Sequence, residues 1–329
     1  MIEGLKFEAA ALAANSSLVS LVVPVFNERE ALAPFVAAID AAVAMGWPGG
    51  EVAPEFELIF IDDGSSDGTA AVVRAMCLAD ARVRLVALSR NFGKEAALSA
   101  GLKAASGDAI IPMDVDLQDP PDLLRPMVDR WRAGAQVVNA KRCDRAADTL
   151  FKRSSSRIFY RVINAFADHP IASDVGDFRF FDRAAVDALN RMTEHSRFNK
   201  GLFSWIGFRT ETLEYTRPAR IVGETKWNAS KLASLALDGI VSSTTLPLRI
   251  WTAIGAMISL FAFCYAVFLI TYTIVYGVDT PGYASIMAAV LFLGGLNLLS
   301  LGLMGEYIGR ISKQVRGRPL YIVSDTEGF

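Results

Sequence analysis

Two long runs without charge constrain the fold of this chain more than any other feature. Residues 250–276 and 284–305 contain no Asp, Glu, Lys or Arg. As α-helices they would extend about 40 Å and about 33 Å, at roughly 1.5 Å per residue. A helix crosses a bilayer with about 20 apolar residues, so each run is long enough. A pair of buried helices in a soluble domain is the alternative, but two such runs in succession favour a transmembrane hairpin.

The residues that flank the two runs predict the orientation of the hairpin. The connector 277–283 carries no basic residue, whereas basic residues lie outside the hairpin at both ends: Arg249, Arg310, Lys313, Arg316 and Arg318. The positive-inside rule places both ends in the cytoplasm. Residues 1–14 lack a basic stretch followed by an apolar core, so we expect no signal peptide. The sequence predicts a multi-pass protein of the inner (cytoplasmic) membrane, with its large polar region and its C-terminus facing the cytoplasm.

Composition disfavours several classes of site. The three cysteines, Cys77, Cys143 and Cys264, are scattered and form neither a disulfide framework nor a zinc-binding spacing. Two histidines are too few for a histidine-based metal site, and the net charge of −2 predicts no nucleic-acid partner.

The region before the charge-free runs has the pattern of an α/β domain. Apolar, strand-like segments occupy residues 18–25, 56–62, 82–88, 108–114 and 135–141, with helical patterns between them. This alternation predicts a mostly parallel sheet covered by helices on both faces. Ligands of such sheets bind at the carboxyl ends of the strands.

Polar segments follow four of these strands. They read PVFNE at 24–28, DDGSSDGT at 62–69, SRNFGKE at 89–95 and MDVDLQD at 113–119. One acidic loop is usually a solvated turn, but four at one edge of a sheet predict a binding site. Within the last segment, Asp119 precedes two prolines, and we expect it to cap the next helix.

The pair Asp114 and Asp116 is suited to a divalent metal ion. A calcium loop would have Glu at its twelfth position, where this chain has Arg125. Two carboxylates at a strand end can instead hold Mg²⁺ or Mn²⁺ together with substrate phosphates. The chain has neither the glycine-rich dinucleotide fingerprint after its first strand nor a P-loop, which disfavours dehydrogenases and P-loop NTPases.

Taken together, the motifs resemble a known family. The segments VVPVFNE, DDGSSDGT, SRNFGKEAALSAGL, MDVDLQDPP and GDFRFFDR, in this order, look like those of family-two GT-A glycosyltransferases. GETKWN at 223–228 and the two-span tail resemble the polyprenyl-phosphate glycosyltransferases, and RNFGKE looks most like the bactoprenol glucosyltransferase branch.

The resemblance implies an α/β chain in four parts. A cytoplasmic GT-A nucleotide-binding domain with a mostly parallel sheet occupies 1–228, and an interfacial amphipathic segment occupies 229–249. Two transmembrane helices, at about 250–276 and 284–305, lie within 250–309. A cytoplasmic tail covers 310–329.

The resemblance also implies roles for individual residues. The nucleotide-sugar-binding residues are Pro24, Asn27, Glu28, Asp62, Asp63, Ser65, Arg90, Lys94 and Asp114. The metal ligands are Asp114, Asp116 and Gln118. The catalytic positions are those of Asp177, as candidate base, and Arg179. The acceptor-phosphate-binding residues are Arg142, Lys152, Ser156, Arg220 and Lys226. Lys200 stands where related sequences have Arg, which keeps the charge but loses bidentate phosphate geometry.

Two of these assignments have structural alternatives. Asp62 and Asp63 could cap the turn and helix that follow them, and Asp177 and Arg179 could form a structural ion pair. A phosphate monoester has a second pKa of about 6 and is largely dianionic at pH 7. We therefore expect Asp177 to be less decisive than a base that acts on a sugar hydroxyl.

The implied function is transfer of a sugar from a nucleotide-sugar, UDP-glucose or another UDP-sugar, to undecaprenyl phosphate or a similar lipid, with inversion at the anomeric carbon.

Residues 141–161 hold seven Lys or Arg and two Asp among apolar residues, the pattern of a helix at an anionic membrane surface or of a solvated basic face. A homotetramer would fit the resemblance. Alternatives are a GDP-mannose-dependent mannose synthase, a processive polysaccharide synthase, a nucleotidyltransferase and a non-catalytic membrane-anchored nucleotide-binding protein.

Overall fold

The α/β prediction is confirmed by a computed structural model, which describes residues 17–47, 52–143, 175–192, 194, 199–216, 246–276 and 282–329. All five predicted strands are present: β1 (Leu18–Val25), β2 (Glu55–Asp62), β3 (Val83–Leu88), β4 (Ala109–Pro112) and β5 (Val137–Arg142). Three further strands join them: β6 (Val175–Asp182), β7 (Thr210–Tyr215) and β8 (Val323–Glu327).

Within the described residues, eight strands form one mixed sheet in the order β7-β5-β6-β4-β1-β2-β3-β8. Strands β4, β1, β2 and β3 are parallel neighbours, and β5 is parallel to β7. β6 runs antiparallel to both β4 and β5, and β8 runs antiparallel to β3. The prediction of a mostly parallel sheet therefore holds for its centre, while one antiparallel strand lies beside β4 and another closes an edge.

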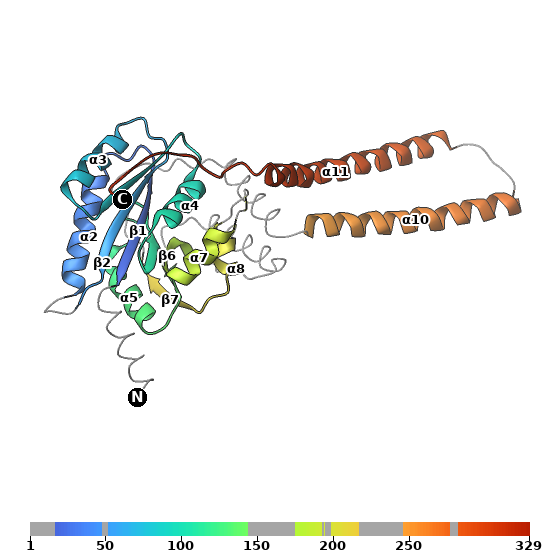
Figure 1. The fold of residues 1–329 in the computed structure, drawn as a ribbon. Helices are drawn as coiled ribbons and strands as arrows, with labels where there is room; N and C mark the ends of the chain where they lie inside the picture. Colours follow the sequence, from blue (N-terminus) through green and yellow to red (C-terminus); the bar gives the residue numbers. More distant parts are fainter. Residues whose placement is uncertain are drawn as a thin grey trace.

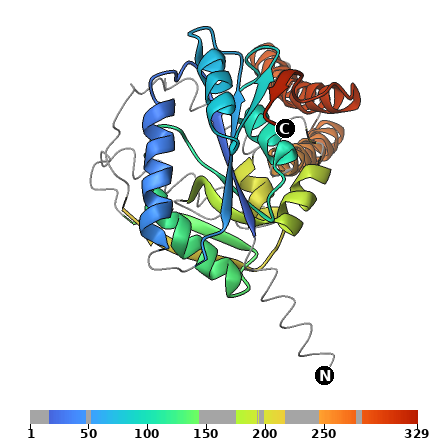
Figure 2. The same ribbon diagram turned by 60° about the vertical axis from the view of Figure 1, so that its left-hand side comes forward.

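Helices cover both faces of the sheet, as the strand pattern predicted. The first face carries α2 (Leu32–Gly46), α3 (Thr69–Ala79) and α5 (Leu124–Arg132), and the second carries α4 (Lys94–Ala104), α7 (Arg183–Arg191) and α8 (Asn199–Trp205). Figure 2 shows α2 and α5 on one side of the strands and α4 on the other.

Alternating side chains of the strands fill the two layers between the sheet and its helices. Leu21 of β1 packs in the layer on the first face, whereas its neighbour Val22 packs in the layer on the second. Phe35 of α2 meets Phe60 of β2 edge-on, with ring centroids 6.1 Å apart. Each fully buried side chain of this size stabilises the fold by roughly 1.5–3 kcal/mol, which explains why the strands read as nearly continuous apolar runs.

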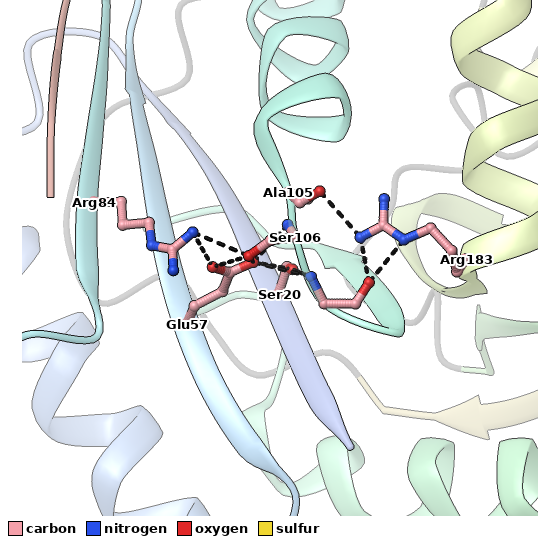
Figure 3. A network of polar contacts seen from close by, with 7 residues as sticks. Ser20, Glu57, Arg84, Ala105, Ser106 and Arg183 are labelled. Atoms are coloured by element: carbon pink, nitrogen blue, oxygen red, sulfur yellow. Dashed lines mark hydrogen bonds and ion pairs between the residues drawn. The ribbon is translucent and has the colours of Figure 1, made fainter. Parts of the chain in front are cut away.

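A polar network around the buried carboxylate of Glu57 holds the edge of the sheet that is formed by the amino ends of β1, β2 and β3 (Figure 3). The carboxylate of Glu57 lies 2.6 Å from the guanidinium of Arg84 and accepts a hydrogen bond from the Ser106 N–H at 2.8 Å. The hydroxyl of Ser20 also donates to Glu57. Arg183 donates to the carbonyl of Ala105 at 3.0 Å. The network fixes the turn between α4 and β4, and it lies at the edge opposite the predicted site.

The two charge-free runs form long helices. α10 covers Leu246–Tyr276 and α11 covers Tyr283–Val315, so α11 continues ten residues beyond the predicted end at 305. Figure 1 shows the helices running side by side away from the α/β domain. Among the described residues, no helix meets the length and apolarity required for a membrane crossing.

Part of the predicted C-terminal tail returns to the sheet. Residues 323–327 form β8, whose pairing with β3 includes Val86 opposite Thr326. Arg74 of α3 holds this strand through Asp325 at 2.8 Å. The tail thus links α11 to the edge of the α/β domain next to the loop that follows β3.

Candidate active site

Four strand ends meet at one edge of the sheet, as the sequence predicted. The register sets Val25 of β1 beside Asp62 of β2, and Asp62 beside Ala87 of β3. Val22 of β1 lies beside Pro112 at the end of β4. Because these strands are parallel, the polar segments that follow them emerge at the same edge.

The loops after β1 and β2 are hydrogen-bonded to each other through Asn27. Its backbone has φ = +55°, a conformation that Asn tolerates better than most residues. Its N–H donates to the hydroxyl of Ser65 at 2.9 Å, and its side-chain oxygen accepts from the Ser66 N–H at 2.9 Å. The Glu28 N–H donates to the hydroxyl of Thr69 at 3.1 Å. Asn27, Glu28 and Ser65 therefore lie together, beside Pro24 near the end of β1.

The acidic pair that ends β2 is buried and shapes the loops around it. The Ser65 N–H donates to the carboxylate of Asp62 at 3.2 Å. The carboxylate of Asp63 accepts from the N–H groups of Phe92 at 2.7 Å and Gly93 at 2.9 Å. Burial raises the pKa of Asp63 above its usual value, and the charge of Asp62 adds to this, while the two hydrogen bonds oppose it.

The structural alternative for this acidic pair is thus present in the fold, because both carboxylates organise turns. Each carboxylate oxygen has two lone pairs, so the geometry is also compatible with the predicted contacts to a base or ribose. Those contacts remain a prediction.

The loops after β2 and β3 pack so closely that one position requires glycine. Gly64 has φ = +73°, and a Cβ there would lie 2.6 Å from the backbone carbon of Arg90. The guanidinium of Arg90 lies over the ring of Phe92, 4.0 Å from its centroid. This contact holds an exposed cation at the edge of the site.

Lys94 contacts both Asp114, a predicted metal ligand, and Asp177, the candidate base. Its ammonium nitrogen lies 2.7 Å from Oδ1 of Asp114 and 3.0 Å from Oδ2 of Asp177. Burial alone would lower the pKa of Lys94, but the two carboxylates outweigh it and raise that pKa above its usual value. The structure therefore brings three predicted site residues, from α4, the loop after β4 and β6, into one charged cluster.

The predicted metal ligands form a tight turn. The Gln118 N–H donates to Oδ1 of Asp116 at 3.1 Å, and Leu117 between them has φ = +56°. The described residues contain no cluster of three His, Cys, Asp or Glu that could hold a metal ion. Two carboxylates still fit a Mg²⁺ or Mn²⁺ site completed by substrate phosphates and water, and the carboxylate of Asp114 already faces a cation, the ammonium of Lys94.

Arg179 lies inside the fold rather than at the sheet edge. Its side chain is 1% exposed, with its guanidinium carbon 5.1 Å from the ring centroid of Phe203 on α8. Its Nε donates to the carbonyl of Gly176 at 3.0 Å. In this position Arg179 holds the start of the strand that carries Asp177, while Asp177 itself forms an ion pair with Lys94.

Asp119 has a different role from the predicted helix cap, and that prediction is wrong. The 3₁₀ turn at Pro121–Leu123 has Pro120 as its first flanking residue, and no side-chain cap hydrogen bond is found there within the described residues. The turn therefore begins one residue later than a cap at Asp119 would require. The carboxylate of Asp119, only 5% exposed, instead accepts from the Tyr215 hydroxyl at 3.4 Å.

Tyr215 also contacts one predicted acceptor-site residue. The Nε of Arg142 donates to the Tyr215 hydroxyl at 3.4 Å, and the two residues lie side by side at the ends of β5 and β7. The sequence analysis did not identify Tyr215 or Thr69 as site residues. Only the strand pairing reveals Tyr215, since it is distant in sequence from the motifs. The other predicted acceptor-phosphate residues, Lys152, Ser156, Arg220 and Lys226, lie outside the described residues, as does the side chain of Lys200.

Comparison with known proteins places the chain among glycosyltransferases. Residues 20–189 match the family "Glycosyl transferase family 2", and residues 246–311 match "GtrB C-terminal hairpin". An uncharacterized glycosyltransferase of Synechocystis sp. is 45% identical over 94% of this chain and 96% of its own length. A prophage bactoprenol glucosyl transferase homolog of Escherichia coli is 44% identical over 93% of this chain and 98% of its own length.

A third relative is the SfII prophage-derived bactoprenol glucosyl transferase of Shigella flexneri, 44% identical over 93% of this chain and 97% of its own length. Among solved structures, mannosyl-3-phosphoglycerate synthase from Rubrobacter xylanophilus has a TM-score of 0.45 and 15% identity, over 73% of this chain and 76% of that chain. That structural likeness is too low to add to the sequence relationship. On the family match and the identity to whole-length relatives, this chain belongs to glycosyl transferase family 2.

Proposed function

We propose that this protein transfers a sugar from a nucleotide diphosphate sugar to a polyprenyl phosphate at the cytoplasmic face of a membrane. The observation that carries the proposal is the cluster of Lys94, Asp114 and Asp177 at the edge where four strand ends meet. Relatives of nearly full length are named as bactoprenol glucosyl transferases, which supports undecaprenyl phosphate as the acceptor.

The donor binds across the loops after β1, β2 and β3. Asn27 and Ser65 form one wall, while Asp62 and Asp63 face the nucleoside and Arg90 lies at the rim. Glucose is the proposed sugar, because the relatives are named glucosyl transferases, and a UDP-sugar is the proposed donor, as the resemblance of the motifs implies. GDP-mannose is the alternative donor, because nothing in the described contacts distinguishes one base or hexose from another.

Asp114 and Asp116, with Gln118, would hold a divalent cation beside the diphosphate. Bound there, Mg²⁺ or Mn²⁺ neutralises the charge that develops on the leaving diphosphate. The turn between Asp116 and Gln118 keeps the carboxylate of Asp116 in place through the Gln118 N–H.

The acceptor phosphate attacks the anomeric carbon directly, and one displacement inverts its configuration. A phosphate with a second pKa of about 6 is already dianionic at pH 7, so the reaction needs no strong base. Asp177 then orients its surroundings through Lys94, 3.0 Å away, rather than accepting the proton. Arg142, held by Tyr215, marks the side from which the acceptor phosphate approaches.

Anchoring by α10 and α11 would bring the lipid acceptor to the site. Many large apolar side chains on these helices are exposed, for example Phe261 at 73% and Ile274 at 78%. Exposed apolar surface of this kind marks a site of contact with a membrane or with another protein, and the charge-free runs at 250–276 and 284–305 favour a membrane. The basic residues at both outer ends favour the cytoplasm for the α/β domain.

A donor screen tests the proposal. The full-length protein is incubated with undecaprenyl phosphate, Mg²⁺ and each of several labelled donors, including UDP-glucose and GDP-mannose, and the lipid is extracted into organic solvent. We expect label in the extract with one UDP-sugar and none without the acceptor. Label with GDP-mannose alone would support the mannose synthase. Donor binding with no labelled lipid for any donor would contradict the proposed transfer to a polyprenyl phosphate.

A further inference from the structure

We propose that Lys94 is an exchangeable counter-ion of the donor site: in the empty site its ammonium joins Asp114 to Asp177, and in the loaded site it moves to the donor diphosphate and releases Asp114 to the divalent cation. The inference rests on the proposed function, which supplies the diphosphate and the cation. In this role Lys94 controls when the carboxylate of Asp114 is available, together with that of Asp116, to bind the divalent cation.

Two neighbouring strands, β4 and β6, lead toward the two carboxylates. β4 and β6 are antiparallel, with Ala109 opposite Asp182 and Ile110 opposite Phe181. The pairing ends at Ile110, and beyond it the chain brings Asp114 within 3.0 Å of the ammonium nitrogen that Asp177 of β6 also contacts. Two carboxylates this close to each other repel, so the site needs a cation between them.

Lys94 meets this need from a third element. It is the first residue of α4, and its ammonium lies 2.7 Å and 2.9 Å from the two oxygens of Asp114. Asp63 fixes the backbone immediately before it by accepting from Phe92 and Gly93. The start of α4 is therefore held in place while the lysine side chain beyond it can turn.

The ion pair of Lys94 and Asp114 is accessible, unlike the structural ion pair of the sheet. The side chains of Lys94 and Asp114 are 44% and 34% exposed. Glu57, by contrast, is 3% exposed and is held by Arg84 together with donors from Ser20 and Ser106. A half-exposed lysine on a flexible stem exchanges partners readily and is a common ligand of phosphate, whereas Glu57 could not lose Arg84 without leaving a buried charge.

The test uses two binding measurements on the full-length protein: Mn²⁺ alone, followed by electron paramagnetic resonance, and UDP in saturating Mn²⁺, followed by calorimetry. For Lys94→Met we expect Mn²⁺ alone to bind more tightly by roughly two- to fivefold, the range for loss of a half-exposed competing ion pair. We expect UDP to bind more weakly by on the order of tenfold, as for loss of one charged hydrogen bond. Tighter Mn²⁺ binding together with weaker UDP binding in the same variant is the result that exchange of Lys94 between Asp114 and the diphosphate predicts.

Two further variants control the experiment. Lys103→Met removes an exposed lysine from the last turn of the same helix and should change neither affinity. Lys94→Arg keeps the charge and should keep Mn²⁺ binding near the wild-type value. Weakening of both affinities in Lys94→Met would overturn the proposal and indicate a purely structural lysine, and so would two unchanged affinities or a wild-type protein that does not bind Mn²⁺.

The binding pattern and the transfer reaction can fail separately. Opposite shifts in the two affinities with no labelled lipid would retain the exchange at Lys94 and contradict the proposed acceptor. Transfer to lipid with unshifted affinities would retain the proposed function and overturn the exchange.

Discussion

The backbone N–H of Ser89 donates to the carbonyl of Ile322 at 2.9 Å, so the C-terminal segment is hydrogen-bonded to the loop that carries Arg90 and leads to Lys94 at the start of α4. Ser324 extends this contact by donating its hydroxyl hydrogen to the carbonyl of Ala87 at 3.0 Å. The chain that leaves α11 thus supports one wall of the candidate donor site.

Removing residues 320–329 tests this support. Without β8, strand β3 becomes an unpaired edge, and we expect a loss of unfolding free energy on the order of 2–3 kcal/mol. UDP affinity should fall as well, because Ser89 loses its partner beside Arg90. Thermal unfolding and UDP titration measure the two effects. Arg74→Ala is the matched control: it removes exposed ion pairs with Asp325 and Glu327 but leaves β8 in place, and each such pair is worth less than about 1 kcal/mol. Wild-type UDP affinity in the truncated protein would show that β8 does not position the loop.

Glu57→Gln should destabilise the protein at neutral pH. Burial would raise the pKa of Glu57, but hydrogen bonds from Ser20 and Ser106 and the charge of Arg84 outweigh it and lower that pKa below its usual value of 4.5. The carboxylate therefore adds stability above pH 4.5, and this contribution is lost as the pH falls through the lower pKa of the folded state. We expect a cost of about 3 kcal/mol at pH 7.

The measurement for Glu57 is thermal unfolding of both proteins between pH 7 and pH 3. The difference in stability between the two proteins should narrow as the pH falls below 4.5. A gap that stays constant over this range would mean that the charge of Glu57 contributes nothing.

Asp116→Asn and Asp119→Asn should separate turnover from stability. The first variant removes a proposed metal ligand, and we expect the transfer rate to fall on the order of 100-fold with little change in melting temperature. The second weakens the buried contact with Tyr215 and should lower stability by about 1–2 kcal/mol. Initial rates and melting curves, measured on the same preparations, separate the effect on turnover from the effect on stability. Full activity in Asp116→Asn would contradict the metal assignment.

Tyr215→Phe should affect the acceptor more than the donor. The hydroxyl lies between Arg142 and Asp119, at 3.4 Å from each. Its loss frees Arg142 to move, so we expect KM for the lipid phosphate to rise about threefold, which corresponds to about 0.7 kcal/mol for one hydrogen bond. KM for the nucleotide-sugar should stay unchanged. An equal rise in both KM values would mean that Tyr215 stabilises the domain as a whole and does not act specifically on the acceptor site.

Much of the fold followed from the sequence because the central strands are buried on both faces. Nearly continuous apolar runs such as 18–25 and 56–62 predict buried strands of a parallel sheet. Ligands of such sheets bind at the carboxyl ends of the strands, which locates the site. β8 was not predicted, because its sequence VSDTE is polar and forms a strand only by pairing with the free edge of β3.

Individual roles in the site depended on contacts between distant segments. Asp177 and Arg179 lie two residues apart on one strand, yet α8 buries the arginine while the aspartate reaches Lys94. Asp119 looked like a helix cap by its position, but the helical turn begins one residue later, after Pro120, and the carboxylate of Asp119 accepts from Tyr215. The partnership of Lys94 with Asp114 and Asp177 joins three elements, and no local pattern predicts it.

The most direct test of the proposed function is the phosphate content of the lipid product. Transfer of the sugar alone to undecaprenyl phosphate yields a lipid with one sugar and a single phosphate, with UDP released in equal amount when a UDP-sugar is the donor. Mass spectrometry of the extracted lipid, with parallel quantification of the released nucleotide, should find this product. A lipid with two phosphates, with UMP as the released nucleotide, would contradict the account.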